Sequence, residues 1–334
     1  IVDFDGETRL YGNADDRLGG EGRLYDHEPP SFQLTVYDEE FDTPRWMREG
    51  LLYQIMPDRF AAHGKNAPET GWLHEKWDEP PAIHVDPRTH DNRADDFFGG
   101  NFRGVMDRLD YLKELGVTAI YFNPVFRARS NHKYDTGDYE TIDPSFGTRE
   151  DFEALCVRAR AVGIRILLDG VFSHTGSDSR YFNRLGRYDS LGAYQSLESP
   201  YASWYRFKRW PDEYDCWWGF ETLPTVDKSD ESYRRYILTD ENAIVKRWLR
   251  RGASGWRLDV ADELPMPFLR TLRKSVKSVD PDAAVLGEVW EDASNKVAYG
   301  QLRCYCLGDT LDSVMNYPLR EGLIGFLLGE IDAY

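Results

Sequence analysis

The sequence predicts an α/β fold in which parallel strands form a (β/α)8 barrel that is incomplete at its C-terminal end. From residue 51 onward, short apolar strands alternate with amphipathic helices. The strands are continuous apolar runs, which is typical of parallel strands buried on both faces. Polar residues gather directly after the strands, where a barrel places its working face. Six strand and helix units precede Tyr334, so we expect the last two units of the barrel to be absent.

The elements follow from the spacing of apolar residues and from stop signals. Leu109, Leu112 and Leu115 fall at helical spacing before Gly116, whose lack of a side chain favours the end of a helix. The expected strands cover residues 51–56, 117–123, 164–168, 255–260, 284–289 and 311–316. The expected helices cover residues 107–115, 149–161, 231–250 and 266–278.

Two segments fall outside this repeat. Residues 1–45 are rich in Gly and Asp and include a strand-like run at 32–37, so we interpret them as the end of a preceding β domain and a linker. Residues 175–230 are rich in Tyr, Trp, Gly and Asp and contain no convincing helix. We therefore assign residues 46–174 and 231–334 to barrel strands 1–6 and residues 175–230 to a lobe inserted after strand 3.

The composition narrows the classes of partner. The 334 residues carry 41 Lys and Arg against 58 Asp and Glu, a net charge of −17, which disfavours nucleic acid and anionic membranes as partners. No apolar run is long enough to span a bilayer. The 4 cysteines suit no disulfide framework or zinc site, so we expect free thiols. We expect a cytoplasmic protein, but the chain begins with Ile1, so its natural N-terminus is expected to be missing and secretion stays open.

Two neighbouring strands each end in a carboxylate. In the run 255–260, Arg257 and Asp259 alternate with apolar residues, so both side chains face into the barrel, and we expect Arg257 to keep Asp259 ionised. Glu288 ends the next strand. A pair of carboxyl groups about 5 Å apart is what a retaining glycosidase requires. The alternatives are a structural ion pair for Asp259 and a helix cap or ion pair for Glu288.

Three further residues lie at strand ends. His174 follows the third strand, where a neutral imidazole could donate to a sugar hydroxyl, and Asp169 could hold the local loops by hydrogen bonds. Tyr134, after the second strand, could stack against a glucosyl ring. The alternative interpretation of His174 is an ordinary loop histidine, and that of the segment around Tyr134 is a turn rich in Asp and Gly.

Four motifs then resemble the α-amylase family of glycoside hydrolases, in particular its neopullulanase, cyclomaltodextrinase and maltogenic amylase group. They are residues 53–60, 169–174, 255–259 and 288–290, and Tyr134 lies in a matching turn. The resemblance implies a TIM barrel with an inserted lobe, and residues 1–45 as the end of an N-terminal β-sandwich. It also implies a covalent glucosyl intermediate on Asp259, proton transfer by Glu288, and substrate contacts from Tyr134, Asp169, His174, Arg257 and Trp290.

The resemblance also sets the expected function and its open alternatives. We expect a hydrolase of α-1,4 bonds in cyclodextrins, pullulan, starch or maltooligosaccharides, with α-1,6 bonds left open because residues 223–228 differ from the family's specificity motif. The third catalytic Asp of the family has no match, so the chain by itself is expected to be inactive. No cofactor is expected to be required, and calcium is the open alternative although residues 61–65 lack its usual ligands. The full-length protein is expected to form a homodimer. A non-catalytic glucan-binding or assembly protein is the competing hypothesis.

Overall fold

The computed structural model describes residues 1–4, 6–17, 19–87 and 92–332, and it divides into two compact units, Ile1–Glu39 and Glu40–Tyr334. The first unit holds an antiparallel sheet of β1 (Val2–Phe4), β2 (Glu7–Gly12) and β3 (Arg23–Tyr25). The strand expected at residues 32–37 is wrong, because this segment is irregular. Leu34 and Val36 are exposed there, and among the described residues the segment pairs with no strand, so its apolar pattern joins no ladder.

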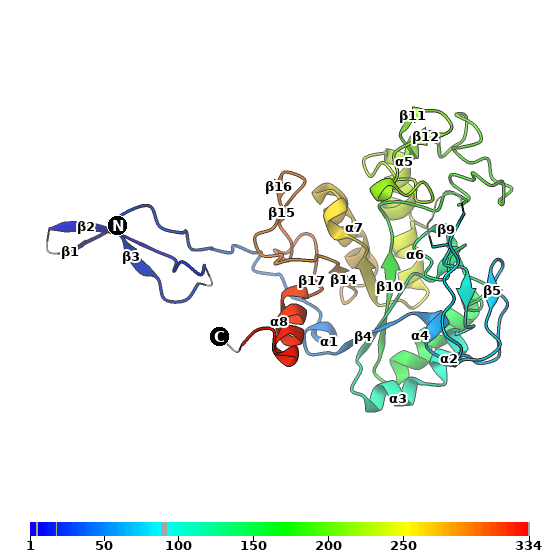
Figure 1. Ribbon diagram of the computed structural model, residues 1–334, viewed down its shortest axis with the longest axis horizontal. Helices are drawn as coiled ribbons and strands as arrows, with labels where there is room; N and C mark the ends of the chain where they lie inside the picture. The colour runs from blue at the N-terminus through cyan, green and yellow to red at the C-terminus, as the bar shows by residue number, and fades with distance from the viewer. Residues whose placement is uncertain (5, 18, 88–91, 333–334) are drawn as a thin grey trace. The chain divides into compact units, whose positions relative to one another are not determined.

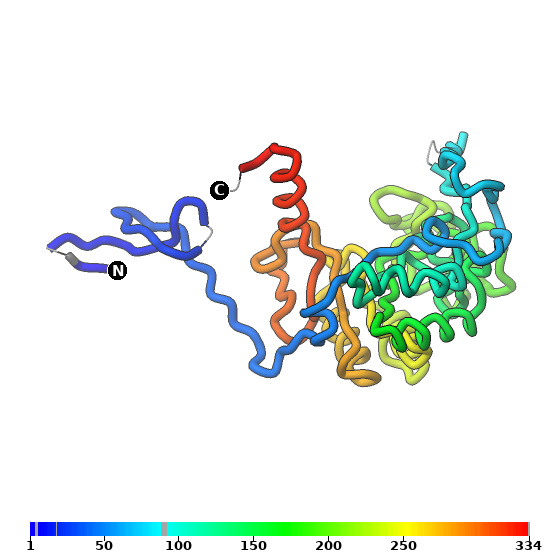
Figure 2. The backbone as a smooth tube through the Cα atoms, turned by 90° about the horizontal axis from the view of Figure 1, so that it is seen from below, coloured from blue at the N-terminus to red at the C-terminus, as the bar shows by residue number. Residues whose placement is uncertain are grey.

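Six parallel strands form the centre of the second unit, and they occur at the six predicted places. Their order in the sheet follows the order in the chain, as in consecutive barrel strands. The colours of Figure 2 pass accordingly from cyan and green through yellow and orange to red across this unit. The strands are β4 (Leu52–Ile55), β7 (Ala119–Phe122), β10 (Arg165–Gly170), β13 (Gly255–Leu258), β14 (Ala284–Gly287) and β17 (Ser313–Val314).

The two faces of this sheet bury different sets of side chains. Ala119, Tyr121, Leu167, Ala284 and Leu286 form a small cluster on the inner face. The alternate residues of the same strands pack against the surrounding helices in a much larger core. The strand alternation predicted from the sequence therefore decides which side chains point into the barrel.

Helices α4 (Arg149–Ala161) and α7 (Met266–Val279) occur where they were predicted. Thr148 and Asp151 form a capping box at the start of α4, which explains its sharp beginning. In Figure 1, α3 and the lobe that carries β11 and β12 lie at opposite ends of β10. No helix in the described part of the chain is long and apolar enough to cross a membrane.

The helix predicted at residues 107–115 occurs as α3 (Leu109–Glu114), and the separate short helix α2 (Phe102–Met106) precedes it. A second predicted helix is interrupted. The segment 231–250 divides into α5 (Glu231–Arg234), a π-helical turn η4 (Arg235–Thr239) and α6 (Ile244–Arg250). The polar run 239–242, whose side chains compete with the backbone for hydrogen bonds, separates the last two.

The inserted lobe has little regular structure of its own. It contains the hairpin of β11 (Phe207–Arg209) and β12 (Glu213–Tyr214) and is held to the rim of the barrel by single bridges such as His174 with Thr225. The remaining elements are α1 (Arg45–Arg48), β5 (Trp72–Leu73), β6 (Asp96–Phe97), β8 (Phe126–Ala128), β9 (Thr136–Ile142), β15 (Val297–Ala298), β16 (Gln301–Leu302), α8 (Tyr317–Leu328), and the short 3-10 turns η1 (Pro57–Arg59), η2 (Ala202–Trp204), η3 (Trp217–Gly219) and η5 (Ala261–Glu263).

Candidate active site

The register of three neighbouring strands brings four charged side chains to one place. Asp169 of β10 pairs with Arg257 of β13, and Arg257 pairs in turn with Leu286 of β14. Asp259 lies two residues beyond Arg257 and therefore on the same face. Glu288 directly follows Gly287, the partner of Leu258, and so stands beside Asp259 at the end of the next strand.

The Arg257 guanidinium binds all three carboxylates. Its Nη1 donates to both oxygens of Asp169, at 3.0 and 2.9 Å, and to Oδ1 of Asp259 at 3.1 Å. Its Nη2 lies 2.8 Å from Oε2 of Glu288. The side chains of Asp259 and Glu288 therefore converge on opposite arms of one guanidinium, from two adjacent strands.

The charges of this cluster do not balance, because three carboxylates share one cation. Burial and the charge of Asp169 raise the pKa of Asp259 to about 8, although Arg257 opposes the change. Burial likewise raises the pKa of Asp169 against the influence of Arg257. Arg257 therefore only partly offsets the burial of Asp259, since its guanidinium is shared by three carboxylates.

Two tyrosines complete the surroundings of Asp169. Oδ2 of Asp169 accepts hydrogen bonds from Tyr121 at 2.9 Å and from Tyr134 at 3.1 Å. Asp169 thus ties together β7, β10, β13 and the loop that carries Tyr134, in agreement with its expected loop-holding role. Sequence reasoning missed Tyr121, although the period of two along β7 places it on the inner face with Ala119.

The strand that carries Asp259 ends in an unusual backbone conformation. Val260 is left-handed, with φ 39° and ψ 68°, a region that a β-branched residue rarely adopts. Its N–H donates to Oε2 of Glu288 at 2.9 Å, and the Glu288 N–H donates to the carbonyl of Leu258 at 3.0 Å. The strained turn therefore fixes the carboxylate of Glu288 next to Asp259. No feature of the sequence signals this conformation.

His174 is buried beneath the cleft. Burial lowers its pKa to about 3, so the imidazole is neutral, as expected. However, Nε2 donates to the carbonyl of Tyr134 at 3.2 Å, and Nδ1 lies 3.1 Å from the hydroxyl of Ser173. Both ring nitrogens thus have protein partners, and a sugar hydroxyl would have to compete with the Tyr134 carbonyl for the N–H.

These groups open into a cleft of about 730 Å³ between the barrel and the inserted lobe. Aromatic rings line the cleft on the lobe side. Trp217 lies 5.3 Å from His174 and 6.1 Å from the ring of Phe220. Trp290, which the sequence predicts as a substrate contact, also lines the cleft and packs edge-on against Trp218 at 5.7 Å. The aromatic side chains of the lobe that line the cleft were not identified from the sequence, because aromatic residues also occur in protein cores and the sequence alone does not separate the two cases.

The loop of residues 61–65, where calcium was the open alternative, contacts the side chain of Asn101. Asn101 is buried, and its side-chain oxygen accepts from the N–H groups of Gly104 and His63 at 2.9 and 3.3 Å. Its amide nitrogen therefore donates to the carbonyl oxygens of His63, Gly64 and Gly99. A calcium ion would need such oxygens as ligands, and here the amide group already uses them. Within the described residues, no group of three or more His, Cys, Asp or Glu side chains could hold a metal ion.

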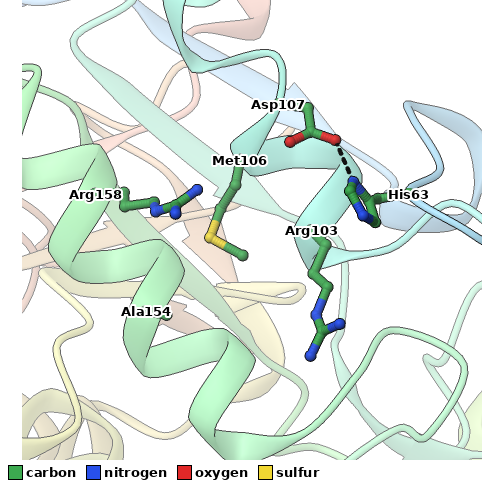
Figure 3. A pocket seen from close by; sticks show the side chains of 6 residues that line it. All are labelled: His63, Arg103, Met106, Asp107, Ala154 and Arg158. Carbon is green, nitrogen blue, oxygen red and sulfur yellow. Dashed lines mark hydrogen bonds and ion pairs between the residues drawn. The ribbon is translucent and has the colours of Figure 1, made fainter.

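A smaller hollow of about 240 Å³ lies between α2 and α4, away from the strand ends (Figure 3). Its charged groups are largely paired within the protein: His63 contacts Asp107 at 2.6 Å, and Arg103 contacts Asp151 at 2.8 Å. It contains no nucleophile or pair of convergent carboxylates, so the cleft is the better candidate for chemistry.

Comparison with known proteins agrees with this geometry. Residues 54–328 match the family described as "Alpha amylase, catalytic domain". The chain is 42% identical over 357 residues to an amylopullulanase of Thermoanaerobacterium saccharolyticum, covering 97% of this chain and 27% of that protein. It is 38% identical over 303 residues to neopullulanase 2 of Thermoactinomyces vulgaris, covering 88% of this chain and 46% of the relative.

Solved structures show the same relation. A cyclic α-maltosyl-(1→6)-maltose hydrolase from Arthrobacter globiformis superimposes with a TM-score of 0.71 at 32% identity, over 87% of this chain and 60% of that chain. The chain spans about a quarter of the length of the amylopullulanase and about half the length of neopullulanase 2.

Proposed function

The chain belongs to the α-amylase family of glycoside hydrolases, and we propose that the whole protein hydrolyses α-glucosidic bonds with retention of configuration. The proposed substrates are cyclodextrins, pullulan, starch or maltooligosaccharides, cleaved at α-1,4 bonds. Cleavage of α-1,6 bonds is the alternative. The names amylopullulanase and neopullulanase among the relatives support testing both linkages.

In the proposed reaction, an oxygen of Asp259 attacks the anomeric carbon while the bond from that carbon to the glycosidic oxygen breaks. Glu288 gives its proton to the departing oxygen. Glu288, now ionised, takes a proton from water, whose oxygen attacks the anomeric carbon and releases Asp259. Two inversions give overall retention.

The observation that carries this proposal is that Asp259 and Glu288, which both line the cleft, contact the same guanidinium of Arg257. The mechanism needs two carboxyl groups side by side, one as nucleophile and one as acid and base, and the shared guanidinium holds Asp259 and Glu288 next to each other. Arg257, which contacts both groups, supports the charged form of the nucleophile.

The competing hypothesis is a non-catalytic amylase-like protein that binds glucans. A binding protein does not need two acids around one guanidinium at the bottom of its cleft, and retaining buried, imperfectly balanced charge costs stability. The presence of both Asp259 and Glu288 therefore favours catalysis.

The test compares the whole protein with its Asp259→Asn and Glu288→Gln variants on cyclodextrin, pullulan and starch. Glu288→Gln should lose about a hundredfold to ten-thousandfold in kcat, since it removes the general acid and base, and Asp259→Asn should lose at least as much. Asp309→Asn, a change at an exposed carboxylate, is the matched control. Activity of the Asp259→Asn variant equal to that of the wild type would remove the mechanism.

Location and assembly are further parts of this proposal. The four free thiols support a reducing compartment such as the cytoplasm. A homodimer of the whole protein is supported by the family resemblance alone, and its mass in solution would decide the matter.

A further inference from the structure

Asp96 of β6 is a buried carboxylate outside the reacting cluster, and four polar groups converge on it. Its Oδ1 accepts hydrogen bonds from Nδ2 of Asn131 at 2.8 Å and from Nη2 of Arg59 at 3.1 Å. Its Oδ2 accepts from the N–H of Ala82 at 3.1 Å and lies 3.3 Å from Nε2 of His74. Burial acts to raise the pKa of Asp96, but the charge of Arg59 and these hydrogen bonds hold it below its usual value. The carboxylate is therefore ionised at neutral pH and attracts all four groups.

Asn131 joins this carboxylate to the turn of residues 130–135. The Asn131 side chain is buried, and its amide nitrogen donates a second hydrogen bond, to the carbonyl of Asp96 at 2.9 Å. Its backbone N–H donates to the carbonyl of Ala94 at 2.7 Å. Three hydrogen bonds thus attach the beginning of this turn to residues 94–96.

The backbone of the turn is strained. Lys133 has a φ of 63°, in the left-handed region, although its side chain is buried. Its ammonium group forms an ion pair with Asp143 at 2.7 Å and lies 5.0 Å from the centre of the Phe97 ring. Its N–H donates to Oγ of Ser130 at 2.9 Å. Such a conformation persists only where the surroundings impose it, so the turn depends on the contacts that hold its ends.

Tyr134 follows in this turn, three positions after Asn131, and it lines the cleft. Its hydroxyl donates to Asp169 at 3.1 Å, and its carbonyl oxygen lies 3.2 Å from Nε2 of His174. The residues that line the cleft include Tyr134, Asp259 and Glu288 but not Asp96. A displacement at Asn131 would therefore reach the cleft through the turn, whereas Asp96 itself lies behind it.

We propose that Asp96 is a positioning residue for the reaction in the cleft. Through Asn131 it fixes the turn 130–135 and thereby holds Tyr134 beside the carboxylates. This inference rests on the proposed function. A carboxylate is suited to the task because it accepts from several donors at once, which a neutral amide cannot do with both of its heavy atoms.

The test measures kcat and KM of the whole protein on maltoheptaose. Asp96→Asn keeps the shape of the side chain but removes the charge and one of the two accepting atoms, so the turn loses its anchor. We expect kcat to fall about ten- to a hundredfold, because small displacements of groups around a reacting centre have effects of this size. KM should change by a smaller factor, since Asp96 touches no part of the cleft.

Asn131→Ala removes the link and leaves Asp96 with its other three partners, so it carries the test even if Asp96→Asn does not fold. It should lower kcat as Asp96→Asn does. The double variant should be no slower than the slower single variant, because both changes interrupt one path. Asp312→Asn is the matched control, since Asp312 is also buried and ion-paired but contacts the beginning of β14, away from the carboxylates at the strand ends. It should lower the melting temperature without changing kcat of the folded protein.

The outcomes separate this inference from the proposed function. If kcat stays within about twofold of wild type in both Asp96→Asn and Asn131→Ala, the positioning role is overturned, while loss of activity in Asp259→Asn still supports the proposed function. Effects that multiply in the double variant overturn the path through Asn131. A wild-type protein that hydrolyses no α-glucan overturns both proposals. Slow single variants, an equally slow double variant and a normal kcat in Asp312→Asn support the positioning role.

Discussion

The Asp169→Asn substitution should make Asp259 a stronger acid. The charge of Asp169 is, after burial, the largest cause of the raised pKa of Asp259. Asn has nearly the same shape, can still accept a hydrogen bond from Tyr121 or Arg257, and removes one negative charge. The pKa of Asp259 should therefore fall from its value of about 8.

The structure sets the size of this effect. Both carboxylates accept from the same Nη1 of Arg257, at 3.0 and 3.1 Å, so these oxygens are at most about 6 Å apart. Two unit charges at that distance repel by about 3 kcal/mol at an effective dielectric constant near 20, which corresponds to about two pH units.

The assay is the pH dependence of kcat/KM for the whole protein on a soluble maltooligosaccharide, because this profile reports the ionisations of the free enzyme. The mechanism needs ionised Asp259, so activity rises with pH through its pKa. In Asp169→Asn that rising limb should move about two pH units toward acid, even if the maximum falls because Tyr134 and Arg257 lose a partner. Asp312→Asn, which alters a buried ion-paired carboxylate elsewhere, should lower stability without moving the limb. A limb that stays in place or moves toward alkaline pH in Asp169→Asn would refute the electrostatic argument.

Three further predictions concern stability. EDTA or added calcium should change the melting temperature of the protein by less than about 1 °C, and a drop of several degrees in EDTA would contradict this expectation. Asn101→Ala should lower the free energy of unfolding by about 1–3 kcal/mol, because it removes the cap of α2 and the hydrogen-bond partner of three carbonyls. Tyr121→Phe should cost about 1.5–3 kcal/mol in urea unfolding, since it removes a hydrogen bond to the buried Asp169 carboxylate, whereas Tyr111→Phe, at a half-exposed site on α3, should cost almost nothing.

Much of the barrel could be predicted from local pattern. Apolar runs and their spacing located all six strands of the parallel sheet and the helix α4. The period of two along β13 placed Arg257 and Asp259 on one face, which is a property of the strand itself. The strand predicted at residues 32–37 failed because a strand forms only where a neighbouring strand pairs with it. The helix predicted at residues 231–250 failed in part because the polar residues 239–242 outweigh the helical spacing of the apolar residues.

The chemistry of the site depends on contacts between residues far apart in the chain, and only the tertiary structure decided it. The sequence predicted that Asp259 and Glu288 end adjacent strands, because alternation along a strand is local and consecutive strands of a barrel lie side by side. It could not determine that Asp169, 88 positions before Arg257, accepts hydrogen bonds from the same guanidinium and adds a negative charge that raises the pKa of Asp259. The left-handed turn at Val260 could not be predicted either, because burial, strain and shared charge exist only once distant segments are packed together.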